Sequence, residues 1–430
     1  MEQFVIEGGH ELNGTITASG NKNAALKMIP ACLLTDEPVI LHNVPDILDV
    51  HVVCDIVRSL GASVEWVEPG VLRLHAKEIT AHEIDRRNAQ SIRASIVLAG
   101  PMLAREGQLI LPPPGGDVIG RRRLDTHMLA LQRLGAQITY DRDHFRMRAK
   151  RMIGANILLD EASVTATENT LMAAVTAEGT TVIRNAASEP HVQDLCHMLN
   201  AMGAQIEGIG SNVLTVHGVD KLHGAEARVG ADYLEVGSFI GAAAVTGGQV
   251  TIKHADPHYL DMIALVFDRL GVRWHTEGQD ITIPRGQPLT IAPDIGDRVP
   301  EIKAQPWPAF PSDLMSIALV VATQAAGTVL FHEWMYDSRF FFVDKLVYMG
   351  ARIILCDPHR VIVQGPARLH GEPERITSPD IRAGIALVLA ALCAEGVTVI
   401  RNVGQIDRGY EDIEGKLRAL GAVIDRQTVD

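Results

Sequence analysis

The chain has 430 residues, of which 47% are hydrophobic and 21% are charged, a composition that indicates an ordinary globular protein rather than a low-complexity one. Its formal net charge of −13 argues against non-specific nucleic-acid binding, so an anionic ligand would need a local basic cluster. Its five cysteines are scattered without a C-x-x-C pair, which argues against a disulfide framework or a metal site and fits a reducing cytoplasm.

The start of the chain shows no targeting signal. Residues 1–20 lack the basic and then apolar segments of a signal peptide. Further along, no apolar run approaches the length of about 18 residues that a membrane span needs. We therefore expect a cytoplasmic protein that binds neither a membrane nor nucleic acid.

The first predicted helix covers residues 21–34, NKNAALKMIPACLL, which are apolar nearly all round and rich in small residues. Such a pattern is typical of a fully buried helix. A strand is predicted at 38–44, followed by an amphipathic helix whose apolar face includes Val53 and Ile56. This second helix is expected to end at Gly61, because glycine takes the left-handed conformation of a helix C′ residue without steric cost.

The same unit recurs along the whole chain. A helical pattern ends six times in a Leu-or-Met, Gly, small-residue triplet, with the glycines at Gly61, Gly135, Gly203, Gly271, Gly350 and Gly421. Further buried helices are predicted at 91–104, 166–177, 235–246, 312–326 and 381–394. Six units with one buried helix each predict two α/β lobes of three units, with the sheets outside. A continuous solenoid and a ring clamp remain alternatives.

Polar residues stand at the starts of all six buried helices. They are Lys22, Arg93, Ser163, Glu235, Asp313 and Arg382. Helix N-termini present unpaired N–H groups and a partial positive charge, so converging N-termini form an anion site. The three basic residues oppose the helix dipole, and a bound anion would offset that cost. Arg122, Arg339 and Arg408 extend the basic set, although a solvated place remains an alternative for any one of these residues.

The loop at 115–125, GGDVIGRRRLD, places one acid beside three arginines. Asp117 has two interpretations. It is either a solvated loop acid paired with Arg121, Arg122 or Arg123, or a proton donor held beside an anion that these arginines bind. The repeat alone predicts a two-lobed protein that binds a multiply charged anion, and it goes no further.

Eight motifs narrow the prediction. In chain order they are ASGNKNAAL, SIRASI, GGDVIGRRRLDTH, EGTTVIRNAASEPHVQDL, PAFPSD, DSRF, DIRAGIALVLA and QIDRGYEDI. Together they resemble the enolpyruvyl transferases that use UDP-N-acetylglucosamine, and the resemblance covers essentially the whole chain. It implies two inside-out α/β lobes, each of three repeated units with buried parallel helices and outer sheets. The first lobe, 22–230, would be inserted into the second, 1–21 plus 231–430.

The resemblance also implies a reaction. The enolpyruvyl group would pass from phosphoenolpyruvate to the 3′-hydroxyl of UDP-N-acetylglucosamine, with release of phosphate and without a cofactor. The sugar oxygen would add to C2 while C3 gains a proton, giving a tetrahedral ketal that then loses phosphate. This reaction would be the first committed step of peptidoglycan synthesis and hence of cell wall biogenesis.

The roles of individual residues follow from the same motifs. The residues implied to bind phosphoenolpyruvate are Lys22, Arg93, Arg122, Arg339, Arg382 and Arg408. Those implied to bind the nucleotide sugar are Asn23, Arg93, Asp125, His127, Ser163, Val164, Glu189 and Asp313. Those implied to be catalytic are Lys22, Asp117, Asp313 and Arg408. Asp313 would act as the base for the sugar hydroxyl, and arginine forks suit both the phosphate and the carboxylate of phosphoenolpyruvate.

Asp117 departs from the family, because most members have cysteine at this position. An aspartic acid can still deliver the proton to C3 if its pKa is tuned toward neutrality. Adjacent arginines favour its ionised form, whereas the incoming phosphate and carboxylate raise its pKa. We therefore interpret Asp117 as the proton donor. The family's cysteine is alkylated by the epoxide antibiotic fosfomycin, so we expect this chain to show fosfomycin resistance.

Three further departures concern the nucleotide sugar. Thr165 stands where the family usually has glycine, in a predicted loop near the uridine diphosphate, while Arg123 replaces a common proline and Glu161 a sometimes basic residue. An enolpyruvyl transferase of specialised metabolism that uses another uridine nucleotide would explain these departures. The enolpyruvylshikimate-phosphate synthases fit less well, because GNKNAA replaces their serine-rich lysine motif. A non-catalytic repeat or ring protein is the alternative from a different class.

Overall fold

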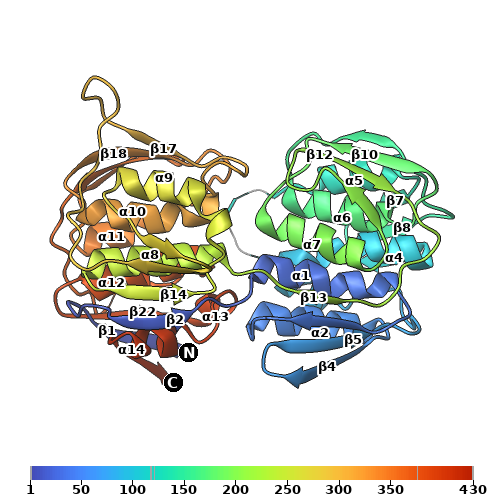
Figure 1. The fold of residues 1–430 in the computed structure, drawn as a ribbon, viewed down its shortest axis with the longest axis horizontal. Coiled ribbons are helices and arrows are strands. Elements are labelled where there is room, and N and C mark those ends of the chain that lie inside the picture. Colours follow the sequence, from blue (N-terminus) through green and yellow to red (C-terminus); the bar gives the residue numbers. More distant parts are fainter. Residues whose placement is uncertain (1, 117–118, 121, 375, 429–430) are drawn as a thin grey trace. The chain divides into compact units, whose positions relative to one another are not determined.

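The computed structural model describes residues 2–116, 119–120, 122–374 and 376–428. These residues form two compact units, which Figure 1 shows. The inserted unit draws its residues from Gly20–Asp117 and Arg122–Gly230. The split unit draws its residues from Met1–Ser19, Val118–Arg121 and Ala231–Asp430. Each unit has a hydrophobic core of its own.

Part of the loop at 115–125 was predicted to lie in the lobe 22–230 but belongs to the split unit. Ile119 and Gly120 belong to the split unit, where the backbone N–H of Ser338 donates to the carbonyl oxygen of Ile119 (3.2 Å). Asp117 and Arg121 lie outside the described residues. The two interpretations of Asp117 therefore remain predictions.

The inserted unit is built around three buried helical segments. Its α-helices are α1 (Lys22–Ala31), α2 (Leu48–Ser59), α3 (Arg86–Ser91), α4 (Ala99–Glu106), α5 (Asp125–Arg133), α6 (Val164–Ala174) and α7 (Pro190–Ala201). Two 3₁₀ helices, η1 (Cys32–Leu34) and η2 (Arg93–Leu98), adjoin α1 and α4. α1, η2 and α6 are buried at nearly every position, whereas α2, α5 and α7 bury mainly one face.

Three sheets complete the inserted unit. The first has the order β13 (Glu226–Arg228), β3 (Val39–His42), β5 (Val71–His75) and β4 (Ser63–Glu68). The second has β6 (Gln108–Leu111), β8 (Phe145–Arg148) and β7 (Gln137–Tyr140). The third has β11 (Gln205–Glu207), β12 (Val213–His217), β10 (Thr180–Arg184) and β9 (Asn156–Leu158). In the first and third sheets an edge strand runs parallel to its neighbour and the other pairs are antiparallel.

The split unit repeats this plan. Its α-helices are α8 (Tyr233–Thr246), α9 (Asp261–Arg269), α10 (Met315–Gln324), α11 (Val343–Tyr348), α12 (Ile381–Cys393), α13 (Gly404–Asp407) and α14 (Ile413–Ala419), and its 3₁₀ helices are η3 (Pro257–Tyr259) and η4 (Ser312–Leu314). α8, α10 and α12 contact one another and are buried at nearly every position. Figure 1 shows these three helices in the interior of the unit.

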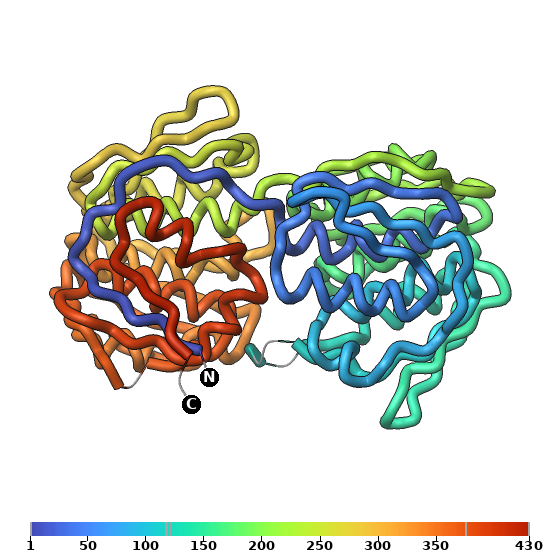
Figure 2. Tube along the Cα trace, turned by 90° about the horizontal axis from the view of Figure 1, so that it is seen from below, coloured from blue at the N-terminus to red at the C-terminus, as the bar shows by residue number. Residues whose placement is uncertain are grey.

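Three sheets surround the helices of the split unit. The first has the order β15 (His275–Glu277), β16 (Asp280–Ile283), β14 (Val250–Lys253) and β2 (Gly14–Thr17). The second has β17 (Glu301–Lys303), β18 (Gly327–His332), β20 (Arg360–Gly365) and β19 (Ile353–Asp357). The third has β21 (Ile376–Thr377), β22 (Val397–Arg401), β1 (Glu2–Glu7) and β23 (Val423–Thr428). β1 is antiparallel to both of its neighbours, so the two ends of the chain complete one sheet, as Figure 2 shows.

The repeat predicted from the glycines is confirmed. All six helix-ending glycines have φ between +81° and +115°, the left-handed region in which a β-carbon would be strained. The fold class is confirmed as well, since each unit holds three buried helical segments and three sheets. The division into two compact units disagrees with a continuous solenoid.

The predicted buried helix at 91–104 is wrong in one respect. It consists of the 3₁₀ helix η2 followed by α4, which begins at Ala99. Pro101 lies in the first turn of α4 and has no N–H to donate to the carbonyl of Val97. A proline is tolerated in a first turn but disfavours a continuous α-helix across this point.

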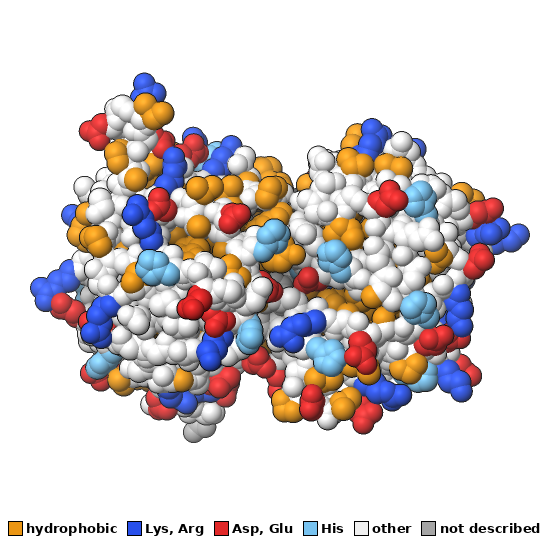
Figure 3. Space-filling view, viewed as in Figure 1, with side chains coloured by type: hydrophobic (Ala, Val, Ile, Leu, Met, Phe, Trp, Pro, Cys, Tyr) orange, Lys and Arg blue, Asp and Glu red, His pale blue; other side chains and the backbone are white. Residues whose placement is uncertain are grey.

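Charged side chains are dispersed over the described surface (Figure 3), beside exposed apolar side chains such as Leu265 and Ile295. Among residues 2–116, 119–120, 122–374 and 376–428, no helix is long and apolar enough to cross a membrane. Figure 3 shows Lys and Arg side chains beside Asp and Glu side chains on the visible face of each unit. Charge of both signs on this face agrees with the expectation that a site for an anion would be local rather than a broad basic surface.

Candidate active site

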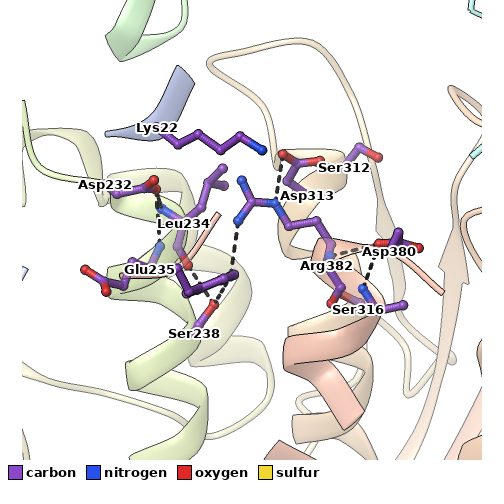
Figure 4. A network of polar contacts seen from close by, with 12 residues as sticks. Lys22, Asp232, Leu234, Glu235, Ser238, Ser312, Asp313, Ser316, Asp380 and Arg382 are labelled. Atoms are coloured by element: carbon purple, nitrogen blue, oxygen red, sulfur yellow. Dashed lines mark hydrogen bonds and ion pairs between the residues drawn. The ribbon is translucent and has the colours of Figure 1, made fainter. Parts of the chain in front are cut away.

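Two buried arginines of the split unit share one carboxylate, that of Asp313 in η4. Figure 4 shows one of them, Arg382, directed at Asp313. Nη2 of Arg339 donates to Oδ1 of Asp313 (2.7 Å), and Nε of Arg382 donates to Oδ2 (3.2 Å). The side chains of Arg339 and Arg382 are only 4% and 6% exposed, whereas that of Asp313 is 30% exposed. The three side chains carry one net positive charge, and the neighbouring acids Asp380 and Asp232 also act on the two guanidinium groups.

Tyr410 and Ser238 extend this cluster. Nη1 of Arg382 donates to the hydroxyl of Tyr410 (3.1 Å), which also forms a hydrogen bond with Oγ of Ser238 (2.9 Å). Burial opposes the charge of Arg382, but Asp313 and Tyr410 outweigh it and hold the pKa of the guanidinium above its usual value. Arg382 is therefore a fixed cation with a fixed orientation.

Acidic N-caps hold the helices that present these residues. Oδ1 of Asp380 accepts from the backbone N–H groups of Arg382 (2.8 Å) and Ala383 (3.0 Å) at the start of α12. Asp232 caps α8 in the same way. An acid at this place offsets an arginine in the first turn. From the sequence, a bound anion alone was expected to offset the basic residues, and the role of these acids was not predicted.

The predicted residue Glu235 is engaged within the split unit. Its Oε2 accepts from the N–H of Ser19 (2.7 Å), and its Oε1 pairs with Nζ of Lys416 (2.6 Å). Arg408 follows α13 and is half-buried, and its Nη1 donates to Oε1 of Gln405 (3.0 Å). Glu235 therefore stabilises the fold, and the contact with Gln405 helps to hold the guanidinium of Arg408 in place.

Lys22 begins α1 in the inserted unit and pairs with a buried acid. Its Nζ lies 2.7 Å from Oδ2 of Asp49, in the first turn of α2, and both side chains are almost fully buried. The N-cap of α1 is Asn21, whose Oδ1 accepts from the N–H of Ala24 (3.0 Å). The pairing with Asp49 fixes the position of the ammonium group of Lys22 and was not predicted.

Arg93 orders the chain that leads into α5. Its Nη2 donates to the carbonyl oxygens of Arg122 (2.6 Å) and Arg123 (3.0 Å). Arg123 in turn pairs with Asp125 (3.2 Å) and Asp160 (3.3 Å). Arg93 was predicted to contact a ligand. In the structure, its Nη2 atom instead donates to the backbone of the predicted ligand residue Arg122.

A pocket of about 750 Å³ lies at the start of α5 in the inserted unit. Its lining residues are Arg123, Leu124, Asp125, Met128, Leu129, Gln132, Arg133, Phe145 and Asp160. Of the predicted nucleotide-sugar residues, Asp125 lines this pocket. Its volume and its mixture of apolar and charged walls suit a small polar ligand.

The other predicted nucleotide-sugar residues stand on helix ends. Asn23 is on α1, Ser163 is the N-cap of α6, Val164 is its first residue, and Glu189 is the N-cap of α7. Oγ of Ser163 accepts from the N–H of Ala166 (3.4 Å). Thr165 was expected in a loop but is the second residue of α6, because the cap at Ser163 starts the helix before it.

Among residues 2–116, 119–120, 122–374 and 376–428, no three His, Cys, Asp or Glu side chains gather closely enough to hold a metal ion. The chemistry of the described site residues is that of fixed cations, carboxylates and hydrogen-bond donors. Such groups bind and orient anions and move protons.

A buried contact between a lysine and a carboxyl group in the inserted unit gives a prediction about pH. Nζ of Lys27 lies 3.4 Å from Oε2 of Glu168, and neither side chain is more than 4% exposed. Burial raises the pKa of Glu168 to about 8, with Lys27 opposing the shift. Between the unfolded value of roughly 4.3 and this folded value, the folded protein binds a proton that the unfolded chain has lost. Stability is therefore lost as pH rises through this window.

Glu168→Gln removes this titration. We expect the variant and the unmodified protein to unfold at similar temperatures near pH 5, where Glu168 is protonated. Near pH 8.5 the variant should melt a few degrees higher, since each pKa unit corresponds to roughly 1.4 kcal/mol. Thermal unfolding at the two pH values measures this difference. An equal change at both pH values would contradict the assignment.

Known proteins are similar to this chain over nearly its whole length. Residues 6–417 match the family model of EPSP synthase (3-phosphoshikimate 1-carboxyvinyltransferase). The UDP-N-acetylglucosamine 1-carboxyvinyltransferase of Bradyrhizobium diazoefficiens is 56% identical over 424 residues, which cover 99% of this chain and 98% of the relative. That of Treponema denticola is 54% identical over 425 residues and 99% of each chain. The crystal structure of the enolpyruvyl transferase NikO from Streptomyces tendae has a TM-score of 0.88 at 26% identity, over 100% of this chain and 99% of that one.

Proposed function

Because the chain belongs to the enolpyruvyl transferase family, among the UDP-N-acetylglucosamine 1-carboxyvinyltransferases, we propose that it transfers the enolpyruvyl group of phosphoenolpyruvate to the 3′-hydroxyl of UDP-N-acetylglucosamine. The observation that carries this proposal is the full-length similarity to relatives of that name. The reaction releases phosphate and supplies peptidoglycan synthesis. A cytoplasmic location is supported by the cysteines, all five of which are free thiols.

The basic residues divide the binding of phosphoenolpyruvate between them. We assign its phosphate to Lys22, Arg122 and Arg408, and its carboxylate to Arg339 and Arg382 with Arg93 nearby. The two guanidinium groups that meet at Asp313 support this assignment, because arginine forks bind carboxylates. Arg93 would act in part through the backbone of Arg122 that it holds.

The nucleotide sugar is assigned to residues at the helix starts. They are Asn23, Arg93, Asp125, His127, Ser163, Val164, Glu189 and Asp313. The N-terminus of α6 presents unpaired N–H groups, which suit the diphosphate. Asp125 begins α5 and lines the pocket of the inserted unit, which the other assigned residues do not line.

The chemical steps need one base and one acid. Asp313 would take the proton of the 3′-hydroxyl as the sugar oxygen bonds to C2 of phosphoenolpyruvate, while Asp117 gives a proton to C3. The resulting ketal then loses phosphate and a C3 proton, which restores the double bond. Asp313 lies 30% exposed beside two cations, which fits a carboxylate that a substrate hydroxyl can reach.

Phosphate release tests this function directly. The purified protein is mixed with phosphoenolpyruvate and, in separate reactions, UDP-N-acetylglucosamine, UDP-glucose or shikimate 3-phosphate. We expect stoichiometric phosphate release with UDP-N-acetylglucosamine and a product whose mass has grown by the enolpyruvyl group. Release only with another uridine nucleotide would favour an enzyme of specialised metabolism, for which the likeness to NikO is the supporting observation. No release with any acceptor would favour a non-catalytic protein.

Arg408→Ala tests the assignment of the phosphate. Loss of this guanidinium should raise the KM for phosphoenolpyruvate about 10- to 100-fold, the effect of a lost hydrogen bond to a charged group, while the KM for the nucleotide sugar changes little. Gln405→Ala is the matched control, since it removes one hydrogen-bond partner of Arg408 but keeps the charge of the guanidinium. A normal KM for phosphoenolpyruvate in Arg408→Ala would remove Arg408 from the site.

A further inference from the structure

Three polar side chains form a chain of hydrogen bonds inside the inserted unit. Asn169 on α6 lies 3.0 Å from Nδ1 of His127 on α5, and Nε2 of His127 lies 3.0 Å from Oγ1 of Thr165 in the first turn of α6. Asn169 and His127 are buried, whereas Thr165 is half-buried. This series of hydrogen bonds therefore runs from the core toward the surface at the start of α6.

Backbone groups fix the direction of Asn169. The N–H of Gly100, in the first turn of α4, donates to Oδ1 of Asn169. Nδ2 of Asn169 donates to the carbonyl oxygen of Ile96 (3.1 Å). A backbone N–H can only donate and a carbonyl can only accept, so the amide has one possible orientation. Its second N–H is then directed to Nδ1 of His127.

The orientation of Asn169 determines the tautomer of His127. Because Nδ1 accepts from Asn169, its proton must be on Nε2 in the neutral ring. Burial, with the charge of Arg93, lowers the pKa of His127 to about 3, so the ring stays neutral at ordinary pH. Nε2–H therefore donates to Oγ1 of Thr165.

The hydroxyl of Thr165 accepts this hydrogen bond and can still donate its own proton to an acceptor. Among the described residues, this is the single hydrogen bond of its side chain, so none of them accepts the hydroxyl proton. The hydroxyl stands beside Ser163 and Val164 at the positive end of α6. This place suits an acceptor that carries negative charge and has no proton of its own, such as a phosphate oxygen.

We propose that Thr165 determines specificity by donating its hydroxyl proton to a phosphate oxygen of the nucleoside diphosphate, with Asn169 and His127 as positioning residues. This inference rests on the proposed function and names a contact for its nucleotide sugar. The glycine that is usual in the family has no hydroxyl, so the contact belongs to this chain. A hydroxyl that can only donate also disfavours ligands that present a donor at this point.

Binding experiments test the contact without turnover. The affinities of UDP-N-acetylglucosamine, UDP and uridine are measured by titration calorimetry for the unmodified protein, Thr165→Val and Thr165→Ser. Valine has nearly the same shape but no hydroxyl. We expect Thr165→Val to weaken UDP-N-acetylglucosamine and UDP about 10- to 100-fold, to leave uridine unchanged, and to be rescued by Thr165→Ser. Unchanged affinity for UDP, or an equal loss for uridine, would overturn the proposal.

The tautomer of His127 tests separately the donor–acceptor order of the hydrogen bonds from Asn169 to Thr165. Spectra of ¹⁵N-histidine-labelled protein should show His127 with its proton on Nε2, unchanged between pH 5 and pH 8. His127→Leu, which lacks this signal, identifies it. A proton on Nδ1 in the unmodified protein would overturn the roles of Asn169 and His127. If the unmodified protein binds UDP as expected but releases no phosphate from phosphoenolpyruvate, the proposed function fails while this inference stands.

Discussion

Asp313→Asn should lower turnover about 10²–10⁴-fold, the range for loss of a positioned general base. The amide keeps the shape of the side chain but cannot take the proton of the sugar hydroxyl. Because Arg339 and Arg382 lose a negative partner, the KM for phosphoenolpyruvate should stay the same or fall. Steady-state rates with both substrates varied separate these two effects.

Asp380→Asn is the matched control for Asp313→Asn. Asp380 also acts on the charge of Arg339, and asparagine caps a helix about as well as aspartate. The control therefore removes a nearby charge without removing the cap or the predicted base, and we expect it to lose less than tenfold in turnover. Equal losses in the two variants would assign the effect to the electrostatic field of the arginines. Near-normal turnover in Asp313→Asn would show that Asp313 is not the base.

The sequence predicted the repeated parts of the fold because they depend on local periodicity. A buried helix needs apolar residues on all sides, and an outer helix that ends in a left-handed residue needs a glycine such as Gly61 or Gly421. Both signals lie within one segment. The break between η2 and α4 depends on Pro101, a local signal that the pattern of apolar residues concealed.

The partners of the site residues could not be read in the same way. Asp313 and Arg382 are 69 residues apart, and Asn169 and His127 are 42 residues apart. Such pairs form because different repeats pack against one another in one unit, and the pattern of one repeat does not say which side chains then touch. Asp49 lies in the first turn of α2, and nothing in its segment indicated that it would pair with Lys22.

Asp117 should make this protein resistant to fosfomycin while it still turns over. It lies outside the described residues, so the prediction rests on the sequence and on the family's cysteine at this position. A thiolate is a strong nucleophile that opens the epoxide, whereas a carboxylate is far weaker. We therefore expect the unmodified protein to keep its activity during prolonged incubation with the epoxide and to gain no mass.

Two substitutions separate the proton donor from a solvated loop acid. Asp117→Cys should keep activity, since a thiol can also give a proton to C3, and should become subject to time-dependent inactivation by fosfomycin. Asp117→Asn keeps the shape but has no acidic proton, so it should lose the chemical step while still binding phosphoenolpyruvate. The assay is turnover of the three forms with and without the epoxide, with mass spectrometry for the adduct. Rapid inactivation of the unmodified protein, or full activity in Asp117→Asn, would show that Asp117 is a loop acid without a role in proton transfer.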